Sequence, residues 1–195
     1  MKDNRTVPLS YYGLPLWLAL LLLAAAGGVR ADPATALVIS RSKQMLEVKQ
    51  GDKIIRHYHV AFGKGGRGSK RKVGDNKTPT GIYRIMEFKA DSRFHYFMQI
   101  NYPNLTDAWH GYKDHLITAT QFRQIAAAYR YGELPPQNTL LGGYIGIHGI
   151  GPVTREKLKI HAIHNWTEGC IALENEEINE LRKFVSIGTP VLITE

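Results

Sequence analysis

The stretch ALVISRSKQMLEVKQGDKIIRHYHVAFG, residues 36–63, has alternating apolar positions. A period of two is that of a β-strand with one buried face. The turn-forming residues Gln50-Gly51-Asp52 interrupt the alternation, so the stretch predicts a β-hairpin. Strand character resumes in GIYRIMEF, residues 81–88, and closes the chain in TPVLITE, residues 189–195.

Two segments show helical spacing instead. Residues 118–132 begin with polar residues, space Phe122 and Ile125 at a helical interval and end in a glycine. In the second segment, Asn175 is the expected N-cap, glutamates fill the first turn, and the helix should stop at Gly188. Strands outnumber helices without βαβ alternation, which predicts a mainly β domain.

The N-terminus has the pattern of an export signal. Two basic residues precede a near-continuous apolar run over residues 14–26, and Val29-Arg30-Ala31 then forms a small-x-small cleavage pattern. We interpret residues 1–31 as a secretory signal peptide and residues 32–195 as one domain. An uncleaved anchor is the weaker alternative, because a spanning helix needs about 20 apolar residues. We expect a periplasmic or cell-envelope protein without stable membrane insertion after cleavage.

The positive net charge of the chain indicates which kind of binding partner to expect. The chain carries a formal net charge of +8, and removal of the signal leaves about +6. Export favours an anionic envelope polymer or lipid surface over nucleic acid, and no nucleic acid is expected. Gly63, Gly65 and Gly68 form a GxGxxG pattern, but they run into Ser-Lys-Arg-Lys rather than opening a helix. We interpret this segment as a mobile basic loop beside a groove.

Cys170, in WTEGCIAL, is the only cysteine of the chain. In an oxidising compartment it has no intramolecular partner, which suggests a reactive thiol or an intermolecular disulfide. A small buried apolar residue is the third interpretation. The count of cysteines does not choose among these.

Histidine is the usual activator of a nucleophilic thiol. His148 is the strongest candidate among eight histidines, because GGYIGIHGIG places it at the end of a glycine-flanked strand. His161 and His164 lie nearer to Cys170 in sequence. If their segment is a strand, they point to opposite faces, so one is packed or exposed and the other lines the site. A zinc site is not expected, since the chain offers no second sulfur.

The residues around the cysteine are candidates for binding the substrate or the oxyanion. Gly169 permits close approach of a substrate and a turn that aims amide N–H groups at an oxyanion. Glu168 could hold a positive substrate group, orient a histidine, or be an exposed charge. Thr167 and Gly149 complete this set.

Several motifs occur in the order found in one family. Ile147-His148-Gly149 is followed by Gly169-Cys170-Ile171, and upstream stand GDNKTPTG, residues 74–81, and INYPN, residues 100–104. Together with the strands of residues 36–63, this pattern resembles the L,D-transpeptidase (YkuD) catalytic domain. The resemblance spans Ala36 to Thr194.

The resemblance implies a β-rich sandwich with two or three short helices. It also implies Cys170 as nucleophile and His148 as proton donor and acceptor. The family attacks the L,D-peptide bond between the third and fourth residues of a peptidoglycan stem and forms a thioester on the cysteine. An amine acceptor completes a transpeptidation, or water completes a hydrolysis, and no metal or organic cofactor is required. Stem peptides are the expected partners, with a wall-attached lipoprotein as a further one.

The chain departs from the family pattern in two places. Thr167-Glu168-Gly169-Cys170 stands where Ser-His-Gly-Cys is common, and Ala172 stands where an arginine is frequent. We expect both differences to affect acceptor choice and carboxylate recognition. The open alternatives are an L,D-carboxypeptidase or endopeptidase, a thiol hydrolase of another substrate, and an idle wall-binding module whose cysteine is alkylated at an ordinary rate. Residues 104–142 are predicted to form a lid or wall of the groove.

Overall fold

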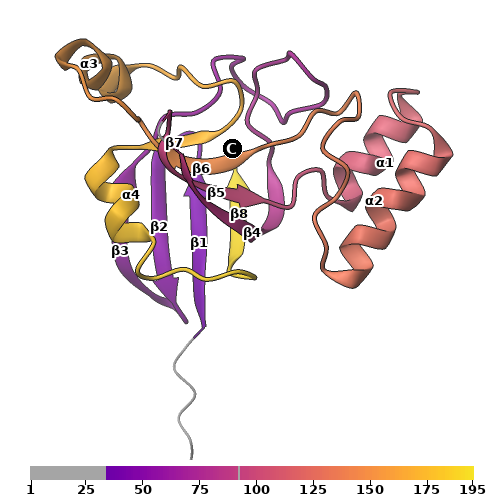
Figure 1. The fold of residues 1–195 in the computed structure, drawn as a ribbon, viewed down its shortest axis with the longest axis horizontal. Helices are drawn as coiled ribbons and strands as arrows, with labels where there is room; N and C mark the ends of the chain where they lie inside the picture. Colours follow the sequence, from indigo (N-terminus) through magenta and orange to yellow (C-terminus); the bar gives the residue numbers. More distant parts are fainter. Residues whose placement is uncertain (1–33, 92) are drawn as a thin grey trace, which may run out of the picture. The chain divides into compact units, whose positions relative to one another are not determined.

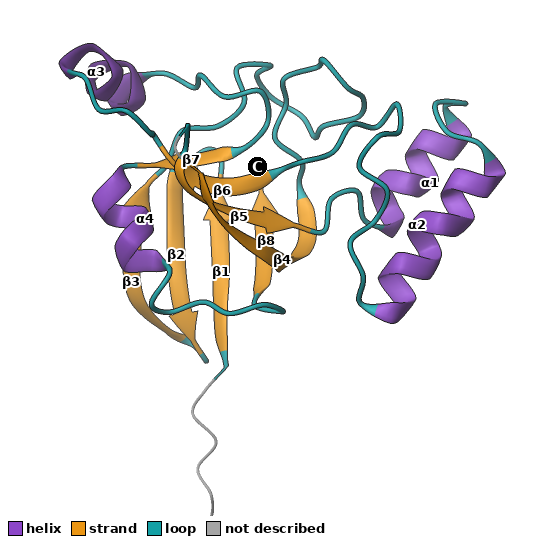
Figure 2. Ribbon diagram, viewed as in Figure 1, coloured by secondary structure: helices purple, strands orange, loops and turns teal. Residues whose placement is uncertain are grey.

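The structure is a computed structural model that describes residues 34–91 and 93–195. The predicted signal peptide lies outside the described residues. The described part forms one eight-stranded sheet in the order β3-β2-β1-β8-β4-β5-β6-β7 and four helices, shown in Figures 1 and 2. The strands are β1 (Thr35–Ser40), β2 (Met45–Gln50), β3 (Lys53–His59), β4 (Gly81–Asp91), β5 (His95–Ile100), β6 (Gly146–Gly149), β7 (Ile171–Leu173) and β8 (Pro190–Thr194). The helices are α1 (Leu105–Lys113), α2 (Ala119–Tyr131), α3 (Arg155–Ile163) and α4 (Asn175–Leu181).

The long strand β4 joins the two halves of the sheet. Its first residues pair with β8, its later residues pair with β5, and the register shifts between Ile85 and Glu87. Such an irregularity bends a strand. Side chains of both halves, such as Leu37 of β1 and Ile147 of β6, belong to one buried cluster. The expected mainly β sandwich is therefore confirmed.

The N-terminal stretch contains three strands rather than the two of a hairpin. β2 and β3 pair antiparallel across the predicted turn at Gly51, and β1 pairs antiparallel with β2. The additional turn lies at residues 41–44, where Gln44 has a φ of 48°. The run of five polar residues at positions 40–44 breaks the strand-like alternation and was the available signal for this turn.

Helix α2 forms as predicted. The Thr118 side chain accepts from the backbone N–H of Gln121, whose side chain binds back to Thr118, and Gly132 ends the helix in the left-handed conformation. Helix α4 is shorter than predicted and ends before Arg182, and Glu174 is its N-cap. The Asn175 side chain instead bonds both the N–H and the carbonyl of Gly151.

The segment that holds His161 and His164 is a helix, α3, so the interpretation as a strand was wrong. Thr154 caps the helix by accepting from the N–H of Lys157. The helix connects two parallel neighbours, β6 and β7, which require a crossover. The described residues thus contain one βαβ unit, and α1 and α3 bring their helices to four where two or three were expected.

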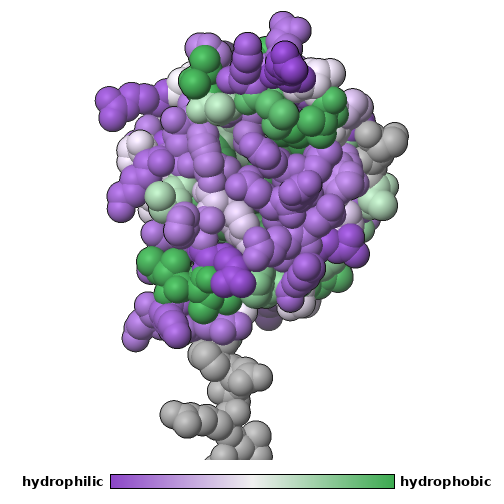
Figure 3. Space-filling model, turned by 90° about the vertical axis from the view of Figure 1, so that its left-hand side faces the viewer, coloured by the Kyte–Doolittle hydropathy of each residue, from purple (hydrophilic) through white to green (hydrophobic). Residues whose placement is uncertain are grey.

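Helix α3 projects from the sheet on the side opposite α1 and α2 (Figure 1). Figure 3 views that side and shows a mainly polar surface with an apolar cluster near its top. Val153, Ile160 and Ile163, in and beside α3, are among the exposed apolar residues. Over residues 34–91 and 93–195, no helix has the length and apolar character needed to cross a membrane.

Helices α1 and α2 have a small core of their own, which contains Ala108, Ile117, Ile125 and Leu141. The Tyr-Pro-Asn motif attaches this pair to the sheet: the Tyr102 hydroxyl donates to the Leu141 carbonyl, and Asn104 caps α1. The motif is therefore explained by packing and capping.

Candidate active site

Three neighbouring strands, β5, β6 and β7, bring the candidate residues to one face of the sheet. Phe97 pairs with His148 and Gln99 with Gly146, and His148 pairs in turn with Ala172. The β6–β7 register, continued by one residue from the pair Ile147–Ile171, sets Cys170 beside Gly146. Because paired residues and alternate residues share a face, Cys170 and His148 lie on the same face of adjacent segments.

The Cys170 thiol is partly buried, and its sulfur donates a hydrogen bond to the Tyr144 carbonyl at 3.5 Å. Burial raises the pKa of the Cys170 thiol to about 11, although the Gly146 backbone N–H and Lys70 act in the opposite direction. The resting group at neutral pH is therefore a thiol.

The His148 imidazole is enclosed by aromatic rings. Its ring centroid lies 4.4 Å from that of Phe94, 6.1 Å from that of Phe97 and 6.0 Å from that of Trp166, and the residue is 1% exposed. Burial lowers the pKa of His148 to about 4. Nδ1 lies 2.8 Å from the Gly149 carbonyl, which can only accept, so Nδ1 carries the proton and Nε2 has the free lone pair.

The turn before Cys170 is held by Thr167. The Thr167 hydroxyl donates to the Cys170 carbonyl at 2.7 Å and accepts from the Gly169 N–H at 3.1 Å. Gly169 has a φ of 134°, and a Cβ at this position would lie 2.8 Å from the Lys77 carbonyl oxygen. A glycine is thus required here by conformation and space, and its N–H is used within the turn.

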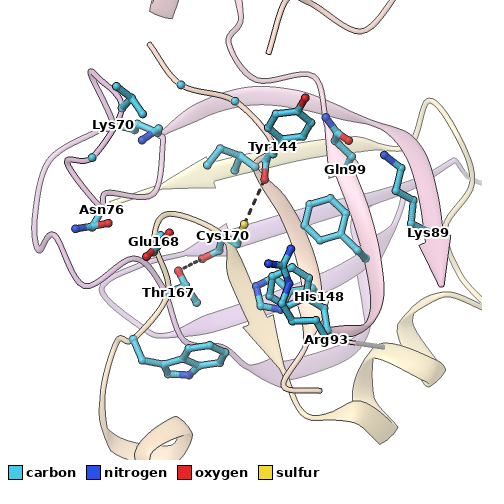
Figure 4. A pocket seen from close by; sticks show the side chains of 18 residues that line it. Lys70, Asn76, Lys89, Arg93, Gln99, Tyr144, His148, Thr167, Glu168 and Cys170 are labelled. Atoms are coloured by element: carbon cyan, nitrogen blue, oxygen red, sulfur yellow. Dashed lines mark hydrogen bonds between the residues drawn. The ribbon is translucent and has the colours of Figure 1, made fainter. Parts of the chain in front are cut away.

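A cavity of about 910 Å³ opens over Cys170 and His148 (Figure 4). Among the described residues, its charged lining consists of three cationic side chains, Lys70, Lys89 and Arg93, and one acid, Glu168. A cavity of this size and sign fits a peptide that carries carboxylates. The remaining lining comes from Val73, Gly74, Asn76, Phe94, Phe97, Gln99, Gly142, Gly143, Tyr144, Ile145, Trp166 and Thr167.

The basic loop at the edge of this cavity is organised by Asp75. The Asp75 carboxylate accepts from the N–H groups of Arg71, Lys72 and Lys77 and pairs at 2.9 Å with the buried Lys70 ammonium. Burial opposes ionisation of Asp75, but these hydrogen bonds dominate and lower its pKa. The Gly-Asp-x-x-Thr-Pro motif is therefore a loop-folding device that positions Lys70 in the cavity wall.

Comparison with known proteins identifies the family. The model of the L,D-transpeptidase catalytic domain, YkuD, matches residues 34–193. The chain belongs to this family. The YafK proteins of Escherichia coli strain K12 and of E. coli O157:H7, named as L,D-transpeptidases, are each 28% identical to it over an alignment of 145 residues that covers 72% of this chain. The match covers 42% of those relatives, so this chain spans less than half of their length.

Solved structures share the fold of this L,D-transpeptidase family member. Bd1075 of Bdellovibrio bacteriovorus has a TM-score of 0.53 at 21% identity, covering 86% of this chain and 50% of that chain. The helical cell shape determining protein Pgp2 of Campylobacter jejuni has a TM-score of 0.54 at 21% identity, covering 84% and 48%.

Four of the residues predicted from sequence line the cavity of this family member: His148, Thr167, Glu168 and Cys170. The other two, Gly149 and Gly169, are not in the lining and act through the residues beside them. The Gly149 carbonyl orients His148, and a Cβ at Gly149 would lie 2.7 Å from Asn175 Oδ1.

The other histidine candidates lie outside the cavity lining. His161 is buried and accepts from the Trp166 indole N–H at 3.3 Å, while His164 is exposed at the end of α3. Neither lines the site, contrary to the expectation for one of them. In the described ranges no group of three or more His, Cys, Asp or Glu side chains could hold a metal ion.

Sequence reasoning missed Gln99, Tyr144 and Trp166, which all line the cavity. Trp166 stands beside the Gly-Cys motif, and this proximity was the available signal. Tyr144 contributes through a backbone in the left-handed region, with a φ of 55°. Of the predicted lid, residues 104–142, only the end at Gly142 reaches the cavity, whereas α1 and α2 stand aside from its lining.

Proposed function

We propose that this protein is a cysteine-dependent L,D-transpeptidase of the cell envelope that acts on peptidoglycan stem peptides. One observation carries the proposal: Cys170 and His148 share one sheet face at the floor of a peptide-sized, largely cationic cavity. Family membership supports the reaction class.

Both catalytic groups begin neutral, because the pKa of the thiol lies above pH 7 and that of the imidazole below it. The thiol first leaves the Tyr144 carbonyl and gives its proton to Nε2 of His148 as sulfur attacks the carbonyl carbon of the L,D-peptide bond. The Gly149 carbonyl stabilises the imidazolium through Nδ1–H. The N–H of Gly169 is engaged in the turn, so the Cys170 N–H is the candidate donor to the oxyanion.

The intermediate collapses when the C–N bond breaks and His148 returns the proton to the departing amine of the D-residue. The acyl group is then a thioester on Cys170. An incoming amine attacks this thioester, loses its proton to His148 and releases the thiol, which gives a transpeptidation product. Water in the same position gives hydrolysis.

The lining of the cavity supports a stem peptide as substrate. Lys89 and Arg93 suit the carboxylates of a stem, a function that the uncharged methyl side chain of Ala172 cannot serve. Within the described ranges of the chain, Glu168 is the one acidic side chain of the lining, and it suits an amino group of the diamino acid or of the acceptor.

Intact-mass spectrometry tests this function. The protein is incubated with a carbapenem and, separately, with a tetrapeptide muropeptide, with Cys170→Ala and His148→Gln as variants. We expect a covalent adduct and turnover in the wild type, neither in Cys170→Ala, and a loss of at least about 100-fold in His148→Gln. Product masses separate amine transfer from hydrolysis. Turnover that survives in Cys170→Ala would exclude the thioester, and binding of muropeptide without turnover would identify a wall-binding module.

A further inference from the structure

The cavity wall contains a buried amide whose oxygen has no donor in the part of the chain that the structure describes. Gln99 of β5 is 1% exposed and lines the cavity, where Figure 4 shows it among the lining side chains. Its Oε1 atom is buried and has no hydrogen-bond partner among the described residues. A buried acceptor without a donor is costly, so this oxygen points to a group that a ligand supplies.

The orientation of the Gln99 amide is determined by Gln137. Gln137 Nε2 donates to the carbonyls of Tyr102, at 2.9 Å, and Pro135, at 2.7 Å. Its Oε1 atom must then be the acceptor that faces Gln99 and Tyr144. Gln99 therefore presents Nε2 to Gln137, at 3.0 Å, and a flipped amide would set two oxygens against each other. The unpaired atom of Gln99 is its oxygen.

Gln99 lies in the same row of the sheet as Cys170, two strands away. Gln99 pairs with Gly146, which the continued register sets beside Cys170, so the three lie in one row across the sheet. Neighbouring strands are about 4.8 Å apart, so the backbones of Gln99 and Cys170 are separated by about 10 Å. An extended peptide covers that distance in roughly three residues.

We propose that Gln99 Oε1 accepts a hydrogen bond from a backbone amide N–H of the bound peptide, two to three residues from the bond that Cys170 attacks. A neutral amide fits better than an ammonium group, because Lys89 and Arg93 line the same cavity. Gln99 is then a specificity residue that sets the register of the peptide. The inference rests on the proposed function.

Gln99 is also connected to the catalytic thiol through the protein. Gln137 Oε1 accepts from the Tyr144 N–H at 2.6 Å, and the Tyr144 carbonyl accepts from Cys170. A substitution of Gln99 could thus act by loosening Tyr144. The test has to separate this structural effect from a lost contact with the substrate.

A double-mutant cycle, with one change in the protein and one in the substrate, separates the structural effect from the lost substrate contact. Gln99→Met keeps the length of the side chain and removes both the Oε1 acceptor and the Nε2 donor to Gln137. Tetrapeptide muropeptides are N-methylated at one stem amide at a time, and kcat/KM is measured for the wild type and the variant. Gln124→Met, on the exposed surface of α2, is the matched control. Thermal unfolding verifies that each variant is folded.

We expect Gln99→Met to lower kcat/KM by about 3- to 10-fold, and N-methylation of one particular amide to do the same in the wild type. In Gln99→Met, methylation of that amide should cost less than about twofold, and Gln124→Met should behave as the wild type. Alkylation of Cys170 should be unchanged in Gln99→Met.

If the losses of kcat/KM from Gln99→Met and from N-methylation simply multiply at every methylated amide, the two groups do not interact. That result would overturn the inference while the proposed function stands. A changed alkylation rate would overturn it too, since Gln99 would then act only through Tyr144. If the wild type turns over no muropeptide of the series, both the proposed function and this inference fail.

Discussion

The resting protonation state of the site predicts how Cys170 responds to an alkylating reagent. The perturbation is pH, scanned from 5 to 10 with iodoacetamide in the absence of substrate. Burial raises the pKa of Cys170 from an ordinary 9.0 to about 11, which lowers the thiolate fraction at pH 7 about 100-fold. A thiolate of higher pKa is more nucleophilic by about 6- to 10-fold over this range. The net expectation is alkylation at least about tenfold slower than that of an ordinary thiol.

The profile of rate against pH is the sharper observable. The rate should rise about tenfold per pH unit up to pH 10 without a plateau. His148→Gln should change it by less than about threefold, because a neutral imidazole supplies no charge to stabilise the thiolate. The measurement is the pseudo-first-order loss of free protein by intact mass, with Cys170→Ala as the blank.

A plateau below pH 8 that disappears in His148→Gln would refute this reasoning, because it would reveal a thiolate–imidazolium pair in the resting protein. The expected slow alkylation also means that the rate of alkylation cannot identify a catalytically idle wall-binding module. Slow alkylation of a free thiol is expected of the active enzyme, so substrate turnover, and not alkylation, must separate the two functions.

The same structure makes three further predictions. On the acid side of its pH profile, kcat/KM should decline near pH 4, because burial lowers the pKa of His148 to about 4 and the imidazole stays a neutral base above that pH. The measurement uses initial rates after brief exposure to acid. A decline near pH 6.5 would contradict the burial of His148 among aromatic rings. Burial lowers the folded-state pKa of both His148 and His161 to about 4, so the unfolded chain binds more protons than the folded chain between pH 6.5 and 4. The free energy of unfolding therefore decreases as pH falls through this range, by up to about 1.4 kcal/mol per pH unit for each histidine. In urea unfolding at several pH values, His161→Gln should show a smaller change of this free energy with pH. Asp75→Ala leaves the Lys70 ammonium buried without its partner and should cost about 3–5 kcal/mol in urea unfolding, with Asp75→Asn intermediate; an unchanged midpoint would show that the ion pair does not hold the loop.

Features with a local cause were predictable from the sequence. The alternation in β2, the turn at Gly51 and the capping residues of α2 depend on neighbours a few positions away. The N-cap of α3, Thr154, was also a local signal, and it was overlooked because the two nearby histidines were considered only as residues of a strand.

The candidate catalytic pair could be named from sequence because of the family motifs, but its geometry could not. His148 and Cys170 are 22 positions apart, and the α3 crossover makes their strands parallel neighbours. The enclosure of His148 requires Phe94 and Phe97, at the start of β5, to converge with Trp166 from the loop before Cys170.

The sequence by itself determined the mainly β class, the L,D-transpeptidase family and the two residues proposed for catalysis, because strand periodicity, capping chemistry and short motifs are encoded locally. Only the tertiary structure decided the neutral state of the thiol and imidazole, the folding of the basic loop around Asp75 and the unpaired oxygen of Gln99. These properties depend on burial and on hydrogen bonds between residues distant in the chain, such as Gln99 and Gln137, and no local pattern records which distant groups will meet.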